Sequence, residues 1–528
     1  YVSRKNLILA TYYILLTTLF YIAFLYTRAR SGVLAAWLSL AFFFVAYFWI
    51  SKKKPYILHT TYYILLILGA ITFFVGQPFT QLEKFTLEGI KKNITNTKTT
   101  KNAPSRPPAP QKFAGELGGT DSGKIRKIVW RGAIDTWRHY PIFGTGVETF
   151  AFAYYRFRPE AHNLTSEWNF LYNKAHNEYL NYLATTGLFG LGTYLIVILT
   201  FVVLCIKYYV LSIKKGIHTT YYILLNTGLF AGYISILVTN FFGFSVVITN
   251  IYLFLIPSFV FVLMKVLKPQ DKPSSSDYHI TPWQWTFIVL IIIIALYVLI
   301  TLLRFWNADK AYSLGYNLDR SGDYQKAYPH LQNAVTTRND EPVFKDELAI
   351  NNAILASTLI NQEGTKTSTA TASLANQLAQ DSIALSNFIA SKHPNNVVFW
   401  KSRVRIFYAL GQADPTYLSH ALEAVKKARE LAPTDANISY NLGVLYGQNN
   451  DTQNGIKTLE NTIRLKPDYR DAYYALALFY HDQAVDKKGN VVDRGKLDKA
   501  IKHLQYILDN LGAEDKVAKE TLEQWKKL

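Results

Sequence analysis

Long apolar runs constrain the fold of this chain more than any other feature of its sequence. A helix that crosses a bilayer needs about 20 mostly apolar residues. The sequence has seven runs close to that length, at about residues 7–26, 33–50, 56–75, 188–206, 219–241, 246–267 and 283–303. These runs predict a polytopic bundle of transmembrane helices, whereas the sequence beyond residue 303 is typical of a soluble domain.

Lysines between the runs predict the orientation of the chain. With alternating spans, the lysine-rich segments at 52–54, 207–215 and 265–272 fall on one side of the membrane. The positive-inside rule assigns that side to the cytoplasm. We therefore expect a multi-pass protein of the cytoplasmic (inner) membrane, in contact with its lipids, with loop 77–178 and the carboxyl-terminal domain extracytoplasmic. Basic membrane loops also explain the net charge of +19, so nucleic acid is not an expected partner.

Beyond residue 304, small and apolar residues recur with the period of tetratricopeptide repeats. Pro433 and Pro467 lie 34 residues apart, which is one such period. Stacked helix pairs of this kind bury a shared core. The expected fold class is therefore all-α, with a transmembrane helical bundle followed by a tetratricopeptide α-solenoid. The expected domains are residues 1–76 (transmembrane helices), 77–178 (extracytoplasmic loop with the catalytic motifs), 179–303 (transmembrane helices) and 304–528 (extracytoplasmic repeats).

The long loop contains a linker and one clear helix. Residues 91–112 are rich in Thr, Asn, Lys and Pro, which is typical of a flexible linker. Between residues 125 and 137, apolar residues recur on one side of a helix. Pro141 ends that helix, and the GTG sequence at 144–146 predicts a turn.

Two arginines in this setting are candidates for phosphate binding. On the predicted helix, Arg126 and Trp130 are one turn apart and share a face. A guanidinium there can offer a planar fork of donors to phosphate oxygens, and the alternative is an ordinary solvated helix face. Arg30 lies in a short external turn, TRARSG (27–32), at the depth of the lipid headgroups. The alternative for Arg30 is a side chain that only snorkels to the interface.

His176, in the sequence AHNEYL, is the candidate proton acceptor. It lies close to the point where the loop re-enters the membrane, and histidine titrates near neutral pH. A structural histidine is the alternative, and His139 and His162 compete for the same role. No His/Cys/Asp cluster has metal-ligand spacing, and the sequence has no Walker loop and no Gly-x-Ser-x-Gly elbow. Neither a metal nor another cofactor is therefore expected.

The predicted site lies where there is normally no pool of ATP or nucleotide sugar. A transferase in that compartment needs a donor whose leaving group is already attached, and a membrane diphosphate has this property. Arginines that converge on the diphosphate would stabilise the charge that develops as it departs.

The order of these motifs resembles the O-antigen ligase and polymerase (Wzy/WaaL-like) family. The motifs are TRARSG, GGTDSGKIRKIVWRGAIDTWRHYPIFGTG, AHNEYL and TTGLFGLG. The resemblance covers about residues 7–270 and implies a C-type glycosyltransferase membrane fold, no metal, and glycans linked to undecaprenyl diphosphate. It also implies that Arg30 and Arg126 bind the diphosphate, while His176 assists the acceptor. The family has more spans than the seven counted here, and we expect the missing ones to precede Tyr1.

The residues and the resemblance together predict a glycosyltransferase. It would move a glycan from undecaprenyl diphosphate to an acceptor hydroxyl on a lipid, a glycan chain end or a protein, at the outer face of the cytoplasmic membrane. The expected catalytic residues are His176, Arg126 and Arg30, and the expected substrate-binding residues are Arg131, Trp130, Arg28, Asn177 and Arg158. The repeats would bind an envelope protein or peptide. The alternative is a non-catalytic, membrane-anchored tetratricopeptide scaffold for envelope assembly.

The lysine distribution yields a test of topology. Single cysteines at Ser105 and Ser439, in a Cys205→Ala background, should react with a membrane-impermeant reagent in intact cells or spheroplasts, because both positions are expected outside. Labelling that appears only after lysis would contradict the outward orientation on which the proposed chemistry depends.

Overall fold

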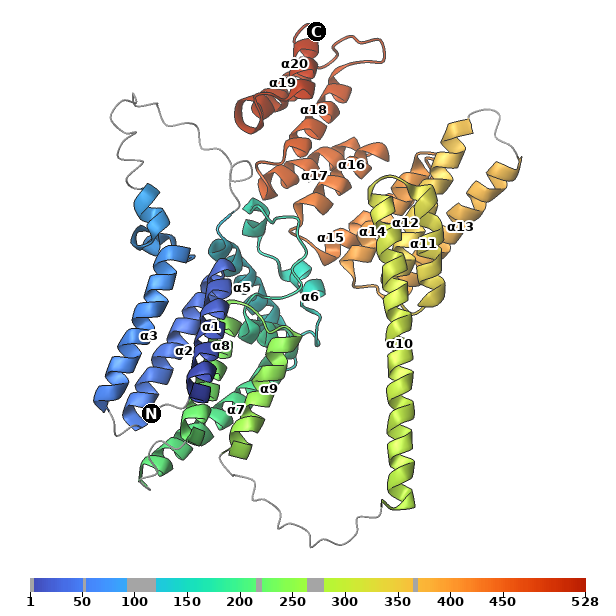
Figure 1. Ribbon diagram of the computed structural model, residues 1–528. Coiled ribbons are helices and arrows are strands. Elements are labelled where there is room, and N and C mark those ends of the chain that lie inside the picture. Colours follow the sequence, from blue (N-terminus) through green and yellow to red (C-terminus); the bar gives the residue numbers. More distant parts are fainter. Residues whose placement is uncertain (1–3, 51–53, 93–119, 215–220, 264–279, 364–368) are drawn as a thin grey trace, which may run out of the picture. The chain divides into compact units, whose positions relative to one another are not determined.

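The computed structural model describes residues 4–50, 54–92, 120–214, 221–263, 280–363 and 369–528 (Figure 1). These residues are mainly helical, and their only extended pairing is an isolated bridge between Val485 and Val491. The chain divides into two compact units. The first comprises Tyr1–Gln111, Ala133–Phe150 and Tyr172–Ser274, and the second comprises Lys112–Gly132, Ala151–Leu171 and Ser275–Leu528.

Apolar helices make up most of the first unit. They are α1 (Arg4–Tyr26), α2 (Arg30–Ile50), α3 (Lys54–Val75), α7 (Glu178–Lys214), α8 (Tyr221–Phe242) and α9 (Val247–Leu263). Over the described residues, each predicted span coincides closely with one of these helices or, for the seventh, with α10 (Pro282–Arg320) of the second unit. Among the described residues, four helices are long and apolar enough to cross a membrane, and these lie at Arg30–Trp49, Glu178–Leu211, Ile223–Phe242 and Pro282–Arg320. Shorter apolar helices lie at Thr11–Tyr26, Thr61–Val75 and Val247–Leu263. The protein is therefore a multi-pass membrane protein, as predicted.

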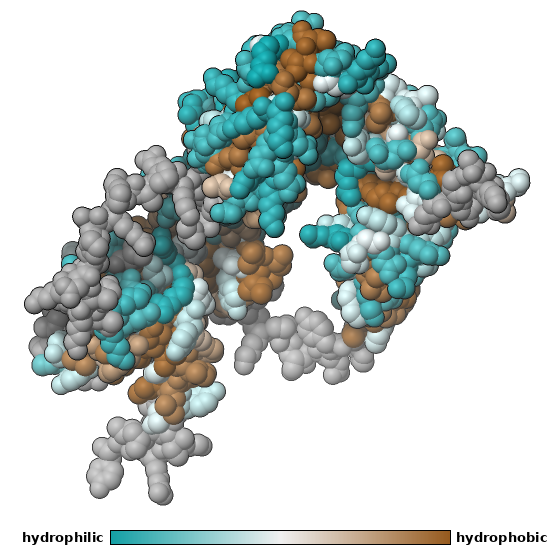
Figure 2. Space-filling view, turned by 90° about the horizontal axis from the view of Figure 1, so that it is seen from above, coloured by the Kyte–Doolittle hydropathy of each residue, from teal (hydrophilic) through white to brown (hydrophobic). Residues whose placement is uncertain are grey.

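Large apolar side chains fill the core of the first unit. Phe201 of α7, Tyr233 of α8 and Leu253 of α9 are almost completely buried in one cluster. In contrast, many apolar side chains of the same helices are exposed, as expected for surfaces that face lipid. Figure 2 shows hydrophobic residues (brown) reaching the surface among hydrophilic ones (teal).

The second unit contains the repeats. After α10 follow α11 (Tyr324–Thr337), α12 (Pro342–Glu363), α13 (Thr369–Lys392), α14 (Val397–Gly411), α15 (Tyr417–Leu431), α16 (Ala436–Gln448), α17 (Thr452–Leu465), α18 (Arg470–Ala484), α19 (Arg494–Tyr506) and α20 (Lys516–Trp525). Successive helices pack in pairs, α10 with α11, α12 with α13, and so on to α18 with α19. This arrangement confirms the predicted tetratricopeptide solenoid, which we call the arm. Two further helices, α5 (Ser122–His139) and α6 (Phe150–Phe157), come from the loop, and the boundary between the units crosses both.

Close helix contacts in the arm depend on small residues. A Cβ atom added to Gly443 of α16 would lie 2.7 Å from Cγ of Leu459 on α17. A Cβ atom added to Gly315 of α10 would likewise lie 2.7 Å from Cγ of Leu331 on α11. Both leucines are fully buried. The small residues in the predicted repeat pattern are therefore required where paired helices approach each other.

Aspartates begin several arm helices. The Asp435 carboxylate accepts hydrogen bonds from the backbone N–H groups of Asn437 and Ile438 at the start of α16. Asp451 caps α17 by accepting from the N–H of Asn454. Such caps satisfy donors that have no partner inside the helix.

Of the two positions proposed for cysteine labelling, Ser439 is poorly placed. Ser439 is completely buried and accepts a hydrogen bond from the Thr462 hydroxyl, so a cysteine there would be protected on either side of the membrane. Ser391, which is exposed near the end of α13, is the better position in the arm. Ser105 lies outside the described residues.

The glycine contacts predict the response of the arm to one added methyl group. Gly443→Ala should destabilise the arm by about 1–3 kcal/mol, because Leu459 must leave its packed position. Gly495→Ala, early in α19, is the matched control: its nearest contact would be ordinary, at 3.5 Å, and alanine has the higher helix propensity. Thermal unfolding of the full-length protein in detergent measures both. Equal unfolding temperatures for the two variants would contradict the proposed role of Gly443.

Candidate active site

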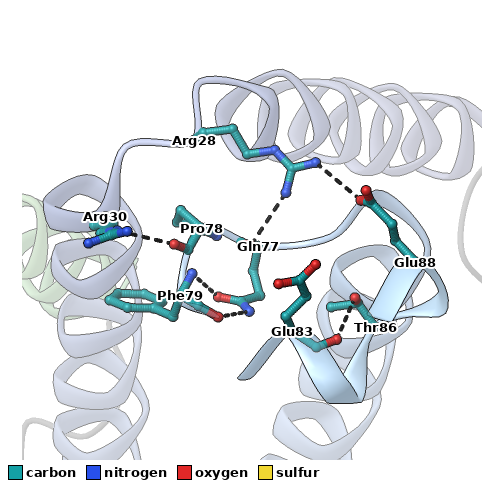
Figure 3. A pocket seen from close by; sticks show the side chains of 8 residues that line it. All are labelled: Arg28, Arg30, Gln77, Pro78, Phe79, Glu83, Thr86 and Glu88. Carbon is teal, nitrogen blue, oxygen red and sulfur yellow. Dashed lines mark hydrogen bonds and ion pairs between the residues drawn. The ribbon is translucent and has the colours of Figure 1, made fainter. Parts of the chain in front are cut away.

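Two predicted arginines meet at one pocket. The turn between α1 and α2 brings Arg28, in a left-handed conformation with φ 53°, close to Arg30, the first residue of α2. The two side chains line a cavity of about 350 Å³ together with residues that follow α3 (Figure 3). The other lining residues are Gln77, Pro78, Phe79, Glu83, Thr86 and Glu88. No motif in the sequence had singled out these six.

Backbone carbonyls after α3 hold both guanidinium groups. Arg28 donates to the carbonyl of Gln77 at 3.3 Å and to that of Val75 at 3.5 Å. Arg30 donates through Nε to the carbonyl of Pro78 at 3.2 Å. These bonds hold the two cations in place at the pocket, and Figure 3 draws the bonds to Gln77 and Pro78.

The pocket also contains acidic residues. Arg28 lies 4.0 Å from Glu88, with exposed fractions of 47% and 63%, and Lys92 lies 2.7 Å from Glu83. Exposed ion pairs contribute little, at most about 1 kcal/mol, so a stronger anion can replace Glu88 at Arg28. The amino terminus of α2 adds the positive end of a helix dipole at Arg30. The arrangement is suited to a small multivalent anion such as a diphosphate.

His176 occupies a strained position just before α7. Its φ is 52°, which is uncommon for a residue with a side chain. The imidazole is half-buried and lies edge-on to the rings of Tyr172, at 5.6 Å, and Phe244, at 5.4 Å. Ring contacts on two sides therefore restrict the orientation of the imidazole.

Asn177 fixes the start of α7. Its side-chain carbonyl accepts from the N–H of Leu180 at 2.9 Å, and its amide donates to the carbonyl of Phe241 at 2.9 Å. Asn177 is 2% exposed. Both ends of this side chain are used inside the protein, and they tie the residue after His176 to the end of α8.

Two stretches of backbone, one in the loop and one in α7, approach each other closely and fix where the loop meets α7. Gly187 has φ 64° and ψ −163° and breaks α7 into two helical parts. At the break, the N–H groups of Leu188 and Phe189 donate to the carbonyls of Pro141 and Ile142. A Cβ on Gly187 would lie 2.3 Å from the Ile142 carbonyl oxygen. The span that was expected to begin at residue 188 is therefore preceded by helix, and the glycine is required because another stretch of backbone occupies the space of a side chain.

The sequence patterns did not identify the charged groups near His176. Lys174 pairs with Glu148 at 2.5 Å. Glu178 is 6% exposed, and its carboxylate accepts from the N–H of Ser245 at 3.4 Å. No spacing motif connects these residues, since Glu148 and Ser245 are far from His176 along the chain.

The third group of predicted residues lies on α5. Asp121 caps this helix by accepting from the N–H groups of Gly123 and Lys124. Arg126 and Trp130 lie one turn apart and are half-buried, while Arg131 is exposed. All the predicted residues except Arg158 thus fall in three groups: the pair at the pocket, the residues at the start of α7, and the set on α5.

Arg158 and the competing His162 are buried together in the second unit. Arg158 is 5% exposed and lies 3.5 Å from Asp435 of the arm. His162 is fully buried; its Nε2 contacts the carbonyl of Glu167, and its Nδ1 lies 2.8 Å from the Tyr154 hydroxyl. A carbonyl only accepts, so Nε2 carries the proton and Nδ1 accepts from Tyr154. His162 is a neutral structural histidine, because burial and the nearby Arg158 guanidinium lower its pKa to about 4.

A comparison with known protein families agrees with the membrane assignment. Residues 14–195 match the family described as O-antigen ligase (Wzy_C), which supports a membrane glycosyl-transfer role of the ligase or polymerase type. A search of curated proteins found no match.

Several solved structures are similar to part of the chain. A thermophilic TPR protein of Thermus thermophilus has 18% identity and a TM-score of 0.30, covering 42% of this chain and 100% of that one. MamA (41-end) of Desulfovibrio magneticus RS-1 has 15% identity and a TM-score of 0.29, covering 40% and 97%. PilF of Pseudomonas aeruginosa has 13% identity and a TM-score of 0.28, covering 42% and 90%.

The buried His162 predicts a pH dependence. In the unfolded chain its pKa has the ordinary value of 6.5, against about 4 in the folded protein. The unfolded state therefore binds more protons between these values, and the stability of segment 151–171 should fall as the pH falls from 6.5 to 4, by on the order of 3 kcal/mol. Hydrogen exchange of this segment, corrected for the intrinsic pH effect, measures the change.

His162→Gln is the informative comparison. It should lower protection at pH 7.5 but remove the loss between pH 6.5 and 4. Burial raises the pKa values of Asp346 and Glu347 in the arm to about 7. These two carboxyl groups therefore increase stability as the pH falls, and they do so equally in the wild type and in His162→Gln. An identical pH profile in the wild type and the variant would contradict the assignment.

Proposed function

We propose that the chain, whose residues 14–195 match the O-antigen ligase family, transfers a glycan from an undecaprenyl-diphosphate donor to an acceptor hydroxyl. The family gives the general class, a membrane glycosyltransferase of ligase or polymerase type. The donor, the acceptor hydroxyl and the outer face of the cytoplasmic membrane are our proposal. The distribution of lysines supports the outward orientation.

The pocket at Arg28 and Arg30 is the observation that carries the proposal. Two guanidinium groups, positioned by carbonyls of Gln77 and Pro78, meet the amino terminus of an apolar helix. A lipid diphosphate has its anionic group at this depth and its polyprenyl chain in the bilayer. The donor would bind with its phosphate oxygens at the two arginines, in place of the weak contact between Arg28 and Glu88.

Arg126 would provide a further contact to the donor. Its neighbours Trp130 and Arg131 on α5 supply an aromatic face and another cation, which suits a sugar next to a phosphate. Cations that are already in place stabilise the charge that develops on the leaving diphosphate without further reorganisation. We assign Arg126 and Arg30 this task.

The chemical step is a displacement at the anomeric carbon. The bond between this carbon and the diphosphate oxygen breaks, and a bond to the acceptor oxygen forms with inversion. The proton of the acceptor hydroxyl passes to His176, or His176 orients the hydroxyl while the proton leaves to water. Undecaprenyl diphosphate departs with the electron pair, so no other co-reactant is needed. Asn177 would hold the backbone next to His176 in place.

The proposal is tested by incubating purified protein with a lipid-linked glycan and candidate acceptors, and measuring release of undecaprenyl diphosphate. Arg126→Lys should reduce transfer by about 10²–10³-fold, because it keeps the charge but loses the bidentate fork. Arg30→Ala should weaken donor binding. His176→Ala should bind donor normally but slow transfer by about 10²–10⁴-fold, the usual contribution of a general base.

Two controls lie on the same helix as Arg126. Arg138 is exposed and pairs with Asp135, so Arg138→Lys should be silent, and the exposed His139 should tolerate alanine. Full activity of Arg126→Lys and His176→Ala would contradict the assigned roles. Absence of release from the wild-type protein with every acceptor would favour the alternative, a membrane-anchored scaffold.

A further inference from the structure

Segment 151–171 of the loop is docked on the arm by a buried ion pair. Arg158 and Asp435 are 5% and 3% exposed, and Nη1 of Arg158 lies 3.5 Å from Oδ2 of Asp435. Arg158 also donates to the side-chain carbonyl of Asn163 at 2.8 Å and to the carbonyl of Trp168. A guanidinium removed from water in this way requires such partners, because an unpaired buried charge is strongly destabilising.

Two equivalent turns of the arm receive this segment. In the turn that follows Pro433, the Thr434 hydroxyl donates to the Arg158 carbonyl, and the Thr434 carbonyl accepts from the Asn163 amide, both at 2.8 Å. One repeat later, beside Pro467, Lys466 donates to the Asn163 carbonyl at 3.1 Å. Segment 151–171 therefore binds the corresponding turns of two consecutive repeats.

Aromatic contacts reinforce the second turn. The ammonium group of Lys466 lies 4.6 Å from the centre of the Trp168 ring, and Tyr469 meets the same ring edge-on at 5.4 Å. Lys466 is 6% exposed, so the contact with the ring is largely desolvated and correspondingly stronger. The outer pair between Arg464 and Glu160 is exposed and contributes little.

The same segment also contacts α5 and the residues just before it. Tyr154 of α6 packs against Gly132 of α5, where an added Cβ would lie 2.5 Å from the tyrosine ring. The next residue, Tyr155, packs on the hydrophobic core of the arm. At the start of α5, Thr120 and Ser166 exchange hydrogen bonds through their backbone N–H groups and hydroxyls, at 2.9 and 2.8 Å. Continuous contacts therefore connect the arm, segment 151–171 and the helix that carries Arg126.

We propose that Arg158 and Asp435 are positioning residues for glycan transfer. By holding segment 151–171, the arm sets the position of α5 and with it the donor contacts of Arg126. This inference rests on the proposed function for its catalytic consequence, but not for its structural part. It assigns these two turns of the arm to the chain's own loop, and it gives Arg158 a role inside the protein in place of direct contact with substrate.

Asp435→Asn separates the two tasks of this carboxylate. Oδ1 caps α16, whereas Oδ2 faces Arg158. Asparagine is an equally good helix cap, but its amide would direct a donor at the guanidinium. Asp451→Asn is the matched control, because Asp451 caps α17 and bonds to Asn454 of its own helix. The experiment uses full-length protein in detergent.

The first readout is hydrogen exchange, which does not require activity. In Asp435→Asn, amides of residues 122–132 and 151–171 should exchange about 10-fold faster or more than in Asp451→Asn. The double variant Arg158→Met/Asp435→Asn, which leaves no unpaired charge, should recover part of the protection. Faster exchange confined to α16, with 122–132 unchanged, would overturn the proposal. If Asp435→Asn unfolds the whole arm, Lys466→Met is measured in its place, under the same criteria.

The second readout is the donor dependence of transfer. Asp435→Asn should raise the KM for the lipid-linked glycan by about 10-fold and leave the KM for the acceptor unchanged, because Arg126 on α5 is proposed to contact the donor and not the acceptor. Equal donor KM values for Asp435→Asn and Asp451→Asn would overturn the catalytic part. If wild-type protein transfers no glycan, the proposed function fails, while the exchange experiment still decides whether the arm positions α5.

Discussion

A guanidinium buried among carbonyls and one carboxylate is the constraint on which much of the second unit depends. Arg158 is stable in its position only if Asp435, Asn163 and Trp168 all stay in place. Two of these partners lie in the loop and one lies in the arm. Its requirement for partners therefore makes segment 151–171 and the arm part of one folded unit, although they are far apart in the sequence.

The first unit has a constraint of a different kind. At Gly187, two stretches of backbone approach so closely that no side chain fits between them. Hydrogen bonds from Leu188 and Phe189 then hold the turn that follows α5. Close backbone packing thus fixes the loop at Pro141 and Ile142, and the buried ion pair fixes it at Arg158.

Periodic features were predictable from the sequence because each depends on neighbours along the chain. Apolar runs gave the membrane helices, the 34-residue spacing gave the arm, and the side-chain pattern between residues 125 and 137 gave α5. The pairing of Arg126 with Trp130 on one face of that helix followed from helical geometry alone.

What was not predictable depends on contacts between distant residues. Arg158 has a side chain of the type that binds phosphate, and only its burial against Asp435 indicates another role. Gln77 and Glu88 line the pocket through the path of the chain after α3, which no spacing encodes.

The hydrogen bond between Thr434 and the Arg158 carbonyl joins residues 276 positions apart. During synthesis at about 5–20 residues per second, the ribosome needs roughly 15 to 55 seconds to produce that partner after Arg158 has been made. Until then the loop has emerged without the surface that it packs against. The maturation of this loop is therefore tied to completion of the carboxyl-terminal half, and an unfinished polypeptide lacks the packing that holds α5 in place.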